Sequence, residues 1–195
     1  MNGITPLATA ALVALAAGLN AQEPLTARAE LLDRDGAHVG TVELTQTPGH
    51  GVLLHIDVWG IEPGGRAIHI HETGRCDPPD FMSSGGHFNP GDAAHGVMHR
   101  DGMHAGDLLN LHIPDDGRLV SEQLARKVTL HESEPASLLG GDGTAIVIHV
   151  SPDDYVSQPT GDAGDRIACG VIRPASAAPA GRPYERSSSP RQPGA

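Results

Sequence analysis

Short runs of β-prone residues, several with alternating apolar and polar positions, make up most of the chain between residues 25 and 172. A period of two is typical of a β-strand with one buried face. The pattern predicts strands at residues 27–32, 39–46, 52–58, 67–71, 108–113, 118–121, 127–130, 145–150 and 167–172. Turn residues such as Asp35-Gly36 and Pro48-Gly49 separate several of these runs. We therefore expect an all-β domain of about eight short strands in an antiparallel sandwich or barrel.

Two long segments interrupt this pattern. Residues 72–106 are rich in Gly, Pro, Asp and His, and residues 151–165 form a second stretch without apolar alternation. A connection as long as the first is uncommon in a compact domain unless it is functional or disordered. The two segments are therefore where we expect the chemistry of this protein.

The two ends of the chain differ from its body. Residues 4–19 carry no charged side chain and are dominated by Ala, Leu and Val, but they are too few to span a bilayer. We interpret residues 1–21 as a signal peptide, with an ordinary apolar N-terminal element as the alternative. Residues 173–195 are rich in Pro, Ser, Ala and Gly and are expected to be disordered. This leaves one domain, residues 22–172, exported to the periplasm or the cell exterior without a membrane span.

Charge and cysteine content narrow the class of protein further. The 195 residues carry a formal net charge of −11, which argues against nucleic acid as a partner. There are two cysteines, Cys76 and Cys169, and they do not form a C-x-x-C pair. In an exported protein an even pair is most simply a disulfide, whereas two free thiols are the alternative in a cytosolic chain.

Histidines provide the candidate chemistry. In His69-Ile70-His71 the i, i+2 spacing on a strand places both imidazoles on one side and Ile70 on the other. This pair is weak evidence alone, but further donors lie in the first long segment and after the run 145–148: His87, His95, His104, Asp107 and His149. Imidazoles with one carboxylate suit zinc or copper. Seven donors exceed the needs of one ion and serve two if one ligand is shared or one site stays open.

Several motifs carry a family resemblance. They are His69-Ile70-His71-Glu72, Gly85-Gly86-His87-Phe88-Asn89-Pro90, His95-Gly96, His104-Ala105-Gly106-Asp107-Leu108, the run 145–149 ending in His149, and residues 161–172 from Gly161-Asp162 to Cys169-Gly170-Val171-Ile172. In this order they closely resemble the copper/zinc superoxide dismutases over residues 25–172. The resemblance implies an eight-stranded antiparallel Greek-key β-sandwich or barrel with long metal-binding and electrostatic loops.

The resemblance also implies a role for each residue. The copper ligands would be His69, His71, His87 and His149, and the zinc ligands would be His87, His95, His104 and Asp107, with His87 bridging the two ions. Asp153 would orient His69 and His95, with Asp154 as the alternative if the register shifts by one residue. Arg166 would hold the anionic substrate, Thr160 would narrow the channel, and a Cys76–Cys169 disulfide would help to hold Arg166.

The implied activity is dismutation of superoxide to dioxygen and hydrogen peroxide, in which copper is alternately reduced and reoxidised and His87 takes up a proton. A catalytically weak or inactive copper/zinc-binding protein of the same fold is the main alternative. A zinc hydrolase would need an open zinc position, and four protein ligands leave none.

The chain departs from the family pattern in two places. Residues 151–165 contain no Lys, and Asp162 and Asp165 precede Arg166, so we expect weaker attraction of superoxide. Extra residues around 78–82 indicate different subunit contacts, and a homodimer remains open.

Overall fold

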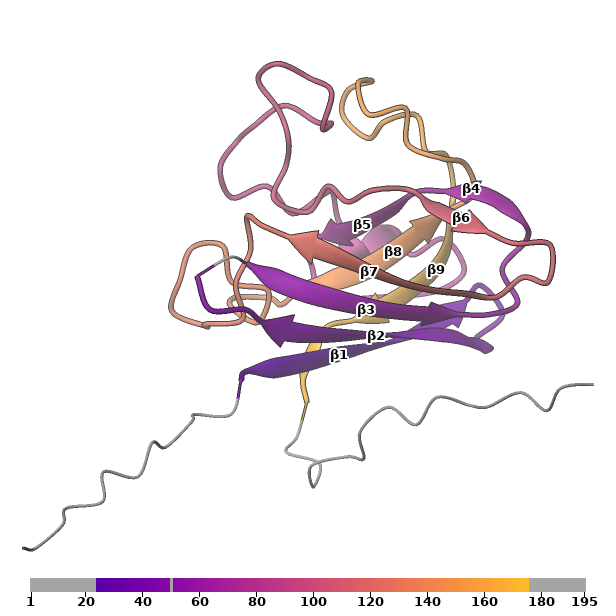
Figure 1. The fold of residues 1–195 in the computed structure, drawn as a ribbon, viewed down its shortest axis with the longest axis horizontal. Coiled ribbons are helices and arrows are strands. Elements are labelled where there is room, and N and C mark those ends of the chain that lie inside the picture. The colour runs from indigo at the N-terminus through magenta and orange to yellow at the C-terminus, as the bar shows by residue number, and fades with distance from the viewer. Residues whose placement is uncertain (1–23, 50, 176–195) are drawn as a thin grey trace, which may run out of the picture.

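The computed structural model describes residues 24–49 and 51–175 (Figure 1). These residues contain one short 3-10 helix, Met82–Ser84, and no α-helix. The strands are β1 (Thr26–Asp33), β2 (His38–Gln46), β3 (Val52–Val58), β4 (Gly64–Arg66), β5 (Ile68–His71), β6 (Leu111–Ile113), β7 (Leu119–Ala125), β8 (Ala145–His149), β9 (Arg166–Val171) and β10 (Arg173–Pro174). In this part of the chain no helix is long and apolar enough to cross a membrane. The predicted signal peptide and most of the predicted tail lie outside the described residues.

The strands form one curled antiparallel sheet in which the order is β5-β8-β9-β1-β2-β3-β7, and β10 pairs with β1. Strands β4 and β6 make a separate pair. After the meander β1-β2-β3 the chain crosses to β5 at the other edge, and later β7 returns beside β3 while β8 returns beside β5. These crossovers are of the Greek-key kind. The expected all-β antiparallel class is confirmed.

Alternating burial explains why these runs form strands. In β3 every second residue, beginning with Val52, is fully buried, and the inward side chains of β2 and β8 join them in one core. Strand β8 is buried on both faces. Ile146 and Ile148 point into the main core, while Ala145 and Val147 pack against Phe81 of the first long segment. That segment covers the outer face of β8, which accounts for its continuous apolar sequence.

The two long segments lie side by side at one edge of the sheet, where Figure 1 shows both rising above β5 and β8. The side chain of Gln158, in the second segment, accepts a hydrogen bond from the backbone N–H of His95 and donates one to its carbonyl. The sheet edge and the paired loops together enclose the histidines.

Some sequence predictions of strands were wrong. Residues 127–130 do not form a strand: Val128 and Leu130 are buried, but the Leu130 N–H donates to the side-chain oxygen of Gln46 instead of joining a ladder. The strand expected at 108–113 is confined to β6, and the one expected at 118–121 extends through β7. Strand β4 was not predicted. Arg173 and Pro174, expected in the disordered tail, pair with β1, so the ordered domain continues past residue 172.

Candidate metal centre

Strand β5 brings the first two histidines to the centre. Ile68 pairs with Ile148 of β8, which fixes β5 in register beside the most apolar strand. His69 and His71 are both almost completely buried, while Ile70 between them lies in the main core. The two imidazoles therefore share one side of the strand, as their spacing predicts.

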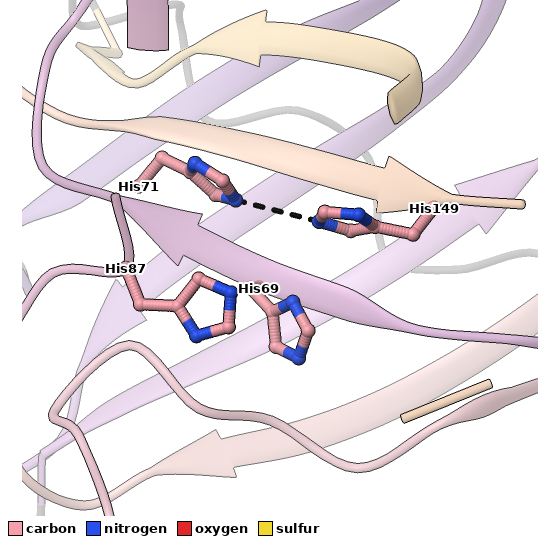
Figure 2. Close-up of side chains that lie close together, drawn as sticks. All are labelled: His69, His71, His87 and His149. Carbon is pink, nitrogen blue, oxygen red and sulfur yellow. Dashed lines mark hydrogen bonds between the residues drawn. The ribbon is translucent and has the colours of Figure 1, made fainter. Parts of the chain in front are cut away.

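Figure 2 shows a group of four imidazoles that converge from three parts of the chain: His69 and His71 from β5, His87 from the first long segment and His149 from the end of β8. One ring nitrogen from each lies within 4.8 Å of the others. The dashed line in Figure 2 joins His71 Nε2 and His149 Nε2, which are 3.4 Å apart.

The hydrogen bonds of the ring nitrogens that face away from the centre of the group determine whether the nitrogens that face the centre carry a proton. His71 Nδ1 lies 2.9 Å from the carbonyl of Gly85, and His149 Nδ1 lies 3.0 Å from that of Gly164. Because a carbonyl only accepts, both Nδ1 atoms must carry the proton, and each Nε2 of these neutral rings presents a lone pair to the centre. His69 Nδ1 and His87 Nε2 are buried without a hydrogen-bond partner among the described residues. The lone pairs that face the centre of the group therefore suit a bound cation.

A second group shares His87 with the first and adds His95, His104 and Asp107. The Nδ1 atoms of His87, His95 and His104 lie 2.9, 3.0 and 3.2 Å from Asp107 Oδ1. Asp107 Oδ2 accepts the backbone N–H groups of Gly96 and His104, so the carboxylate cannot rotate freely. His87 presents one ring nitrogen to each group, which makes its imidazole the link between them.

Asp153 lies behind both groups. Its Oδ2 is 2.9 Å from His69 Nε2, and its Oδ1 is 3.0 Å from His95 Nε2. The backbone of Asp153 is held in turn by the side-chain amide of Asn110. Neighbouring Asp154 is exposed and accepts hydrogen bonds from Ser157 instead. Of the two aspartates considered from the sequence, Asp153 is thus the one that contacts the histidines.

Burial keeps two histidines of the first group neutral. It lowers the pKa of His69 to about 4 and that of His149 to about 3, even though Asp153 opposes the shift at His69. At His95 burial acts in the same direction, but the hydrogen bonds to Asp107 and Asp153 outweigh it and raise the pKa to about 9. At neutral pH His69 and His149 are in the unprotonated form that binds metals, whereas His95 attracts positive charge, as a proton or as an ion.

Arg166 lies in front of the first group, at the start of β9. One guanidinium nitrogen, Nη1, donates to the Phe81 carbonyl at 2.7 Å and to Ser84 Oγ at 3.0 Å, and Nη2 donates to the Gly85 carbonyl at 2.7 Å. Burial lowers the pKa of Arg166 from its ordinary value, and the nearby carboxylate of Asp80 opposes this. The guanidinium is held by neutral acceptors, which leaves its charge available to an anion.

An open pocket of about 390 Å³ leads to these residues, and its lining consists of Arg34, His71, Pro79, Asp80, Met82, His149, Thr160, Gly164, Asp165 and Arg166. Thr160, for which the resemblance implies a place in the channel, is among these lining residues. A larger groove of about 720 Å³ is lined by residues of β1, β2, β9 and β10, but its lining contains none of the histidines and not Arg166. We take the smaller pocket as the functional one because it reaches the imidazoles of His71 and His149.

The two cysteines form a disulfide, Cys76–Cys169, with 5.6 Å between the Cα atoms, as predicted. It ties the start of the first long segment to β9, three residues after Arg166. The segment that supplies the carbonyl acceptors of Arg166 is thereby fixed to the strand that carries it.

Comparison with known proteins identifies the family. Residues 38–172 match the sequence profile described as Copper/zinc superoxide dismutase (SODC). The chain belongs to the copper/zinc superoxide dismutase family. A Cu-Zn superoxide dismutase of Aquifex aeolicus is 43% identical over 164 residues, which cover 84% of this chain and 96% of the relative. The crystal structure of a SOD-like protein from Bacillus subtilis has a TM-score of 0.72 at 37% identity, covering 74% of this chain and 96% of the other. The Cu/Zn superoxide dismutase of Brucella abortus has a TM-score of 0.62 at 26% identity, covering 76% and 99%.

The residues present fit the two ions that give the superoxide dismutase family its name. Four imidazoles without a carboxylate, two of them with unpartnered buried nitrogens, suit copper. Three imidazoles and the carboxylate of Asp107 suit tetrahedral zinc.

Sequence reasoning missed several residues that shape the centre of this family member. Asn110 holds the backbone of Asp153, and Gly161 has a positive φ where a Cβ atom would lie 1.9 Å from Asp153 Oδ1. Arg34 and Asp80 line the pocket. The turn-prone Thr160-Gly161 sequence carried a signal for the glycine, but nothing local to Arg34 marks it as part of a site 132 residues further along the chain.

Proposed function

We propose that this protein dismutes superoxide, with copper held by His69, His71, His87 and His149 and zinc held by His87, His95, His104 and Asp107. The observation that carries the proposal is the pair of buried donor groups joined through His87, with Arg166 at the end of an open pocket. Family membership supports the same reaction. Overall, two superoxide ions and two protons give one dioxygen and one hydrogen peroxide.

Bound copper would supply the reversible one-electron acceptor that this reaction needs, and zinc would supply fixed positive charge beside His87. The protein provides the rest. The carbonyls of Phe81 and Gly85 hold Arg166 so that its guanidinium faces the pocket, where it binds the superoxide anion. Asp153 fixes the orientation and tautomer of His69 and His95 through their Nε2 atoms.

His87 is the residue placed to move a proton. Its Nδ1 faces Asp107, while its Nε2 is buried without a partner among the described residues. We assign to His87 Nε2 the uptake of a proton in one half of the cycle and its return to the departing peroxide in the other.

The deciding experiment measures the second-order rate of superoxide consumption by the copper- and zinc-loaded protein. His149→Ala should reduce the rate to that of buffer, because the copper group loses a ligand. Arg166→Ala should reduce it roughly tenfold or more, since a charge-assisted interaction with the anion is lost. Arg118→Gln is the control: Arg118 is exposed and pairs with Asp57 on β3.

The same measurement tests the alternative of a catalytically weak or inactive metal-binding protein. That alternative holds if the loaded wild type binds both ions but is no faster than buffer. A wild type that consumes superoxide through Arg166 and His149 excludes it.

We also propose that the chain is exported, with residues 1–21 as the signal peptide and residues 22–172 as the dismutase domain. The Cys76–Cys169 disulfide supports an oxidising compartment, either the periplasm or the cell exterior. The acidic charge argues against nucleic acid as a partner. Homodimer formation stays a prediction, which sedimentation of the purified protein would test.

A further inference from the structure

The mouth of the pocket is electrostatically balanced. The residues that line it include two cations, Arg34 and Arg166, and two carboxylates, Asp80 and Asp165. Without Arg34 the formal charge of this lining would be −1, and the whole chain already carries −11. An approaching anion therefore meets a neutral entrance only because Arg34 is present.

Arg34 reaches this position from a distant part of the sequence. It directly follows β1, in the turn to β2, where Asp33 Oδ1 accepts the backbone N–H groups of Asp35 and Ala37. This arrangement fixes the turn that carries Arg34. The Arg34 side chain then lies against the end of the second long segment and the start of β9.

Two contacts hold the guanidinium of Arg34. Its Nε donates to the main-chain carbonyl of Arg166 at 2.8 Å, and its Nη2 pairs with Asp165 Oδ2 at 3.1 Å. The side chain of Asp165 is 78% exposed and that of Arg34 is 41% exposed, so both charges face the solvent from which substrate arrives. Arg34 thus neutralises the carboxylate of Asp165, next to Arg166, and holds the backbone of Arg166 through a hydrogen bond.

The position of Arg34 matters because the second long segment carries no positively charged side chain. Residues 151–165 contain four aspartates and no Lys or Arg, so the segment itself offers nothing to attract superoxide. The two histidines of the pocket lining, His71 and His149, belong to the metal centre. Among the described residues that line the pocket, positive charge comes from Arg166 and Arg34 alone.

We propose that Arg34 is the guidance residue of this enzyme: it neutralises Asp165 and supplies the positive charge at the pocket mouth that lets superoxide reach Arg166. The proposal rests on the proposed dismutase function. Arg34 acts through the field at the entrance and through the position of Arg166, without taking part in the chemistry.

The test compares variants that separate charge from hydrogen bonding. Arg34→Gln keeps a donor but loses the charge, and it should lower the second-order rate with superoxide about two- to fourfold at low ionic strength. The loss should disappear at about 0.5 M salt, because screening removes the repulsion by Asp165. Arg34→Lys keeps the charge and should retain the wild-type dependence on salt. Arg34→Gln combined with Asp165→Asn restores a neutral entrance and should recover the rate, and Arg118→Gln is the control.

A wild-type rate for Arg34→Gln at low salt would overturn the proposal. So would a loss that is independent of salt and is not rescued by Arg34→Lys, since that result would make Arg34 a structural anchor only.

Binding of azide, an anion of the same charge as superoxide, supplies a readout without turnover. In the copper-loaded protein, an optical titration should show weaker azide binding to Arg34→Gln than to wild type at low salt. If wild type consumes no superoxide but this difference is found, the dismutase function fails and the guidance role stands. If wild type consumes superoxide and azide binding is unchanged, the guidance role alone fails.

Discussion

Replacing Asp153 with Asn keeps the shape of the side chain but turns one of its two acceptors into a donor. Asp153 Oδ1 accepts the backbone N–H of Tyr155 as well as His95 Nε2, so the amide oxygen of the variant takes that position. The amide nitrogen then faces His69 Nε2, which in wild type donates to Oδ2. Two donors cannot pair, and the site is too deeply buried for water to relieve them.

His69 can resolve this conflict by carrying its proton on Nδ1 instead. That atom is one of the two unpartnered nitrogens of the copper group among the described residues, and a lone pair is required there. The expected result is a loss of copper affinity of about 10- to 100-fold, or about 1.4 to 2.8 kcal/mol, with a much smaller effect on zinc.

Competition titrations against chelators of known affinity measure both ions separately. Asp154→Asn is the matched control, since the neighbouring carboxylate is exposed and contacts no histidine of the centre. Wild-type copper affinity in Asp153→Asn, or an equal loss for both ions, would refute the reasoning about the tautomer of His69.

Three further expectations concern stability. Cys169→Ser should lower the free energy of unfolding by about 4 to 5 kcal/mol, because the disulfide closes a loop with a sequence separation of 93 residues; equilibrium denaturation under non-reducing conditions measures this. Gly161→Ala should lower the free energy of unfolding by about 2 kcal/mol and reduce metal affinity, since the added Cβ collides with Asp153. A thermal shift and a metal titration measure the two effects. Unchanged values would show that the loop around residue 161 moves to accommodate the added Cβ. In the metal-free protein, burial sets the pKa of His69 to about 4 and that of His149 to about 3, below the unfolded value of about 6.5. Between about pH 4 and 6.5 the unfolded chain therefore binds protons more readily than the folded protein. The free energy of unfolding should fall by several kcal/mol as the pH drops from about 6.5 to 4. Denaturation at each pH tests this, and a free energy of unfolding that does not change with pH would contradict it.

The features that follow from local periodicity could be predicted from the sequence. The i, i+2 spacing of His69 and His71 fixes their common side regardless of the rest of the fold, and the apolar run before His149 requires a buried strand. The glycines and prolines likewise marked the two long segments correctly. The grouping of seven donors into two sets sharing His87 needed the family resemblance, because spacing alone does not say which loop residues meet.

Features decided by tertiary contacts could not be predicted in this way. Residues 127–130 have the composition of a strand, but the side chain of Gln46 satisfies the Leu130 N–H and removes the need for a partner strand. Strand β4 contains two glycines in three residues and carries no apolar signal, and only its pairing with β6 orders it as a strand. Arg34 gave no signal for a similar reason: its role depends on β1 ending beside β9, which no local pattern encodes.

The place of β9 in the sheet has a consequence for how the protein is made. Strand β9, the last of the long strands that the structure describes, fits between β8 and β1. Until residues 166–174 have left the ribosome, both neighbours present open edges, and a partial chain is exposed to pairing with other molecules. The sheet therefore closes late, when the C-terminal strand arrives. A chain truncated before β9 would lose Arg166 and Cys169 together with the strand that joins its beginning to its end.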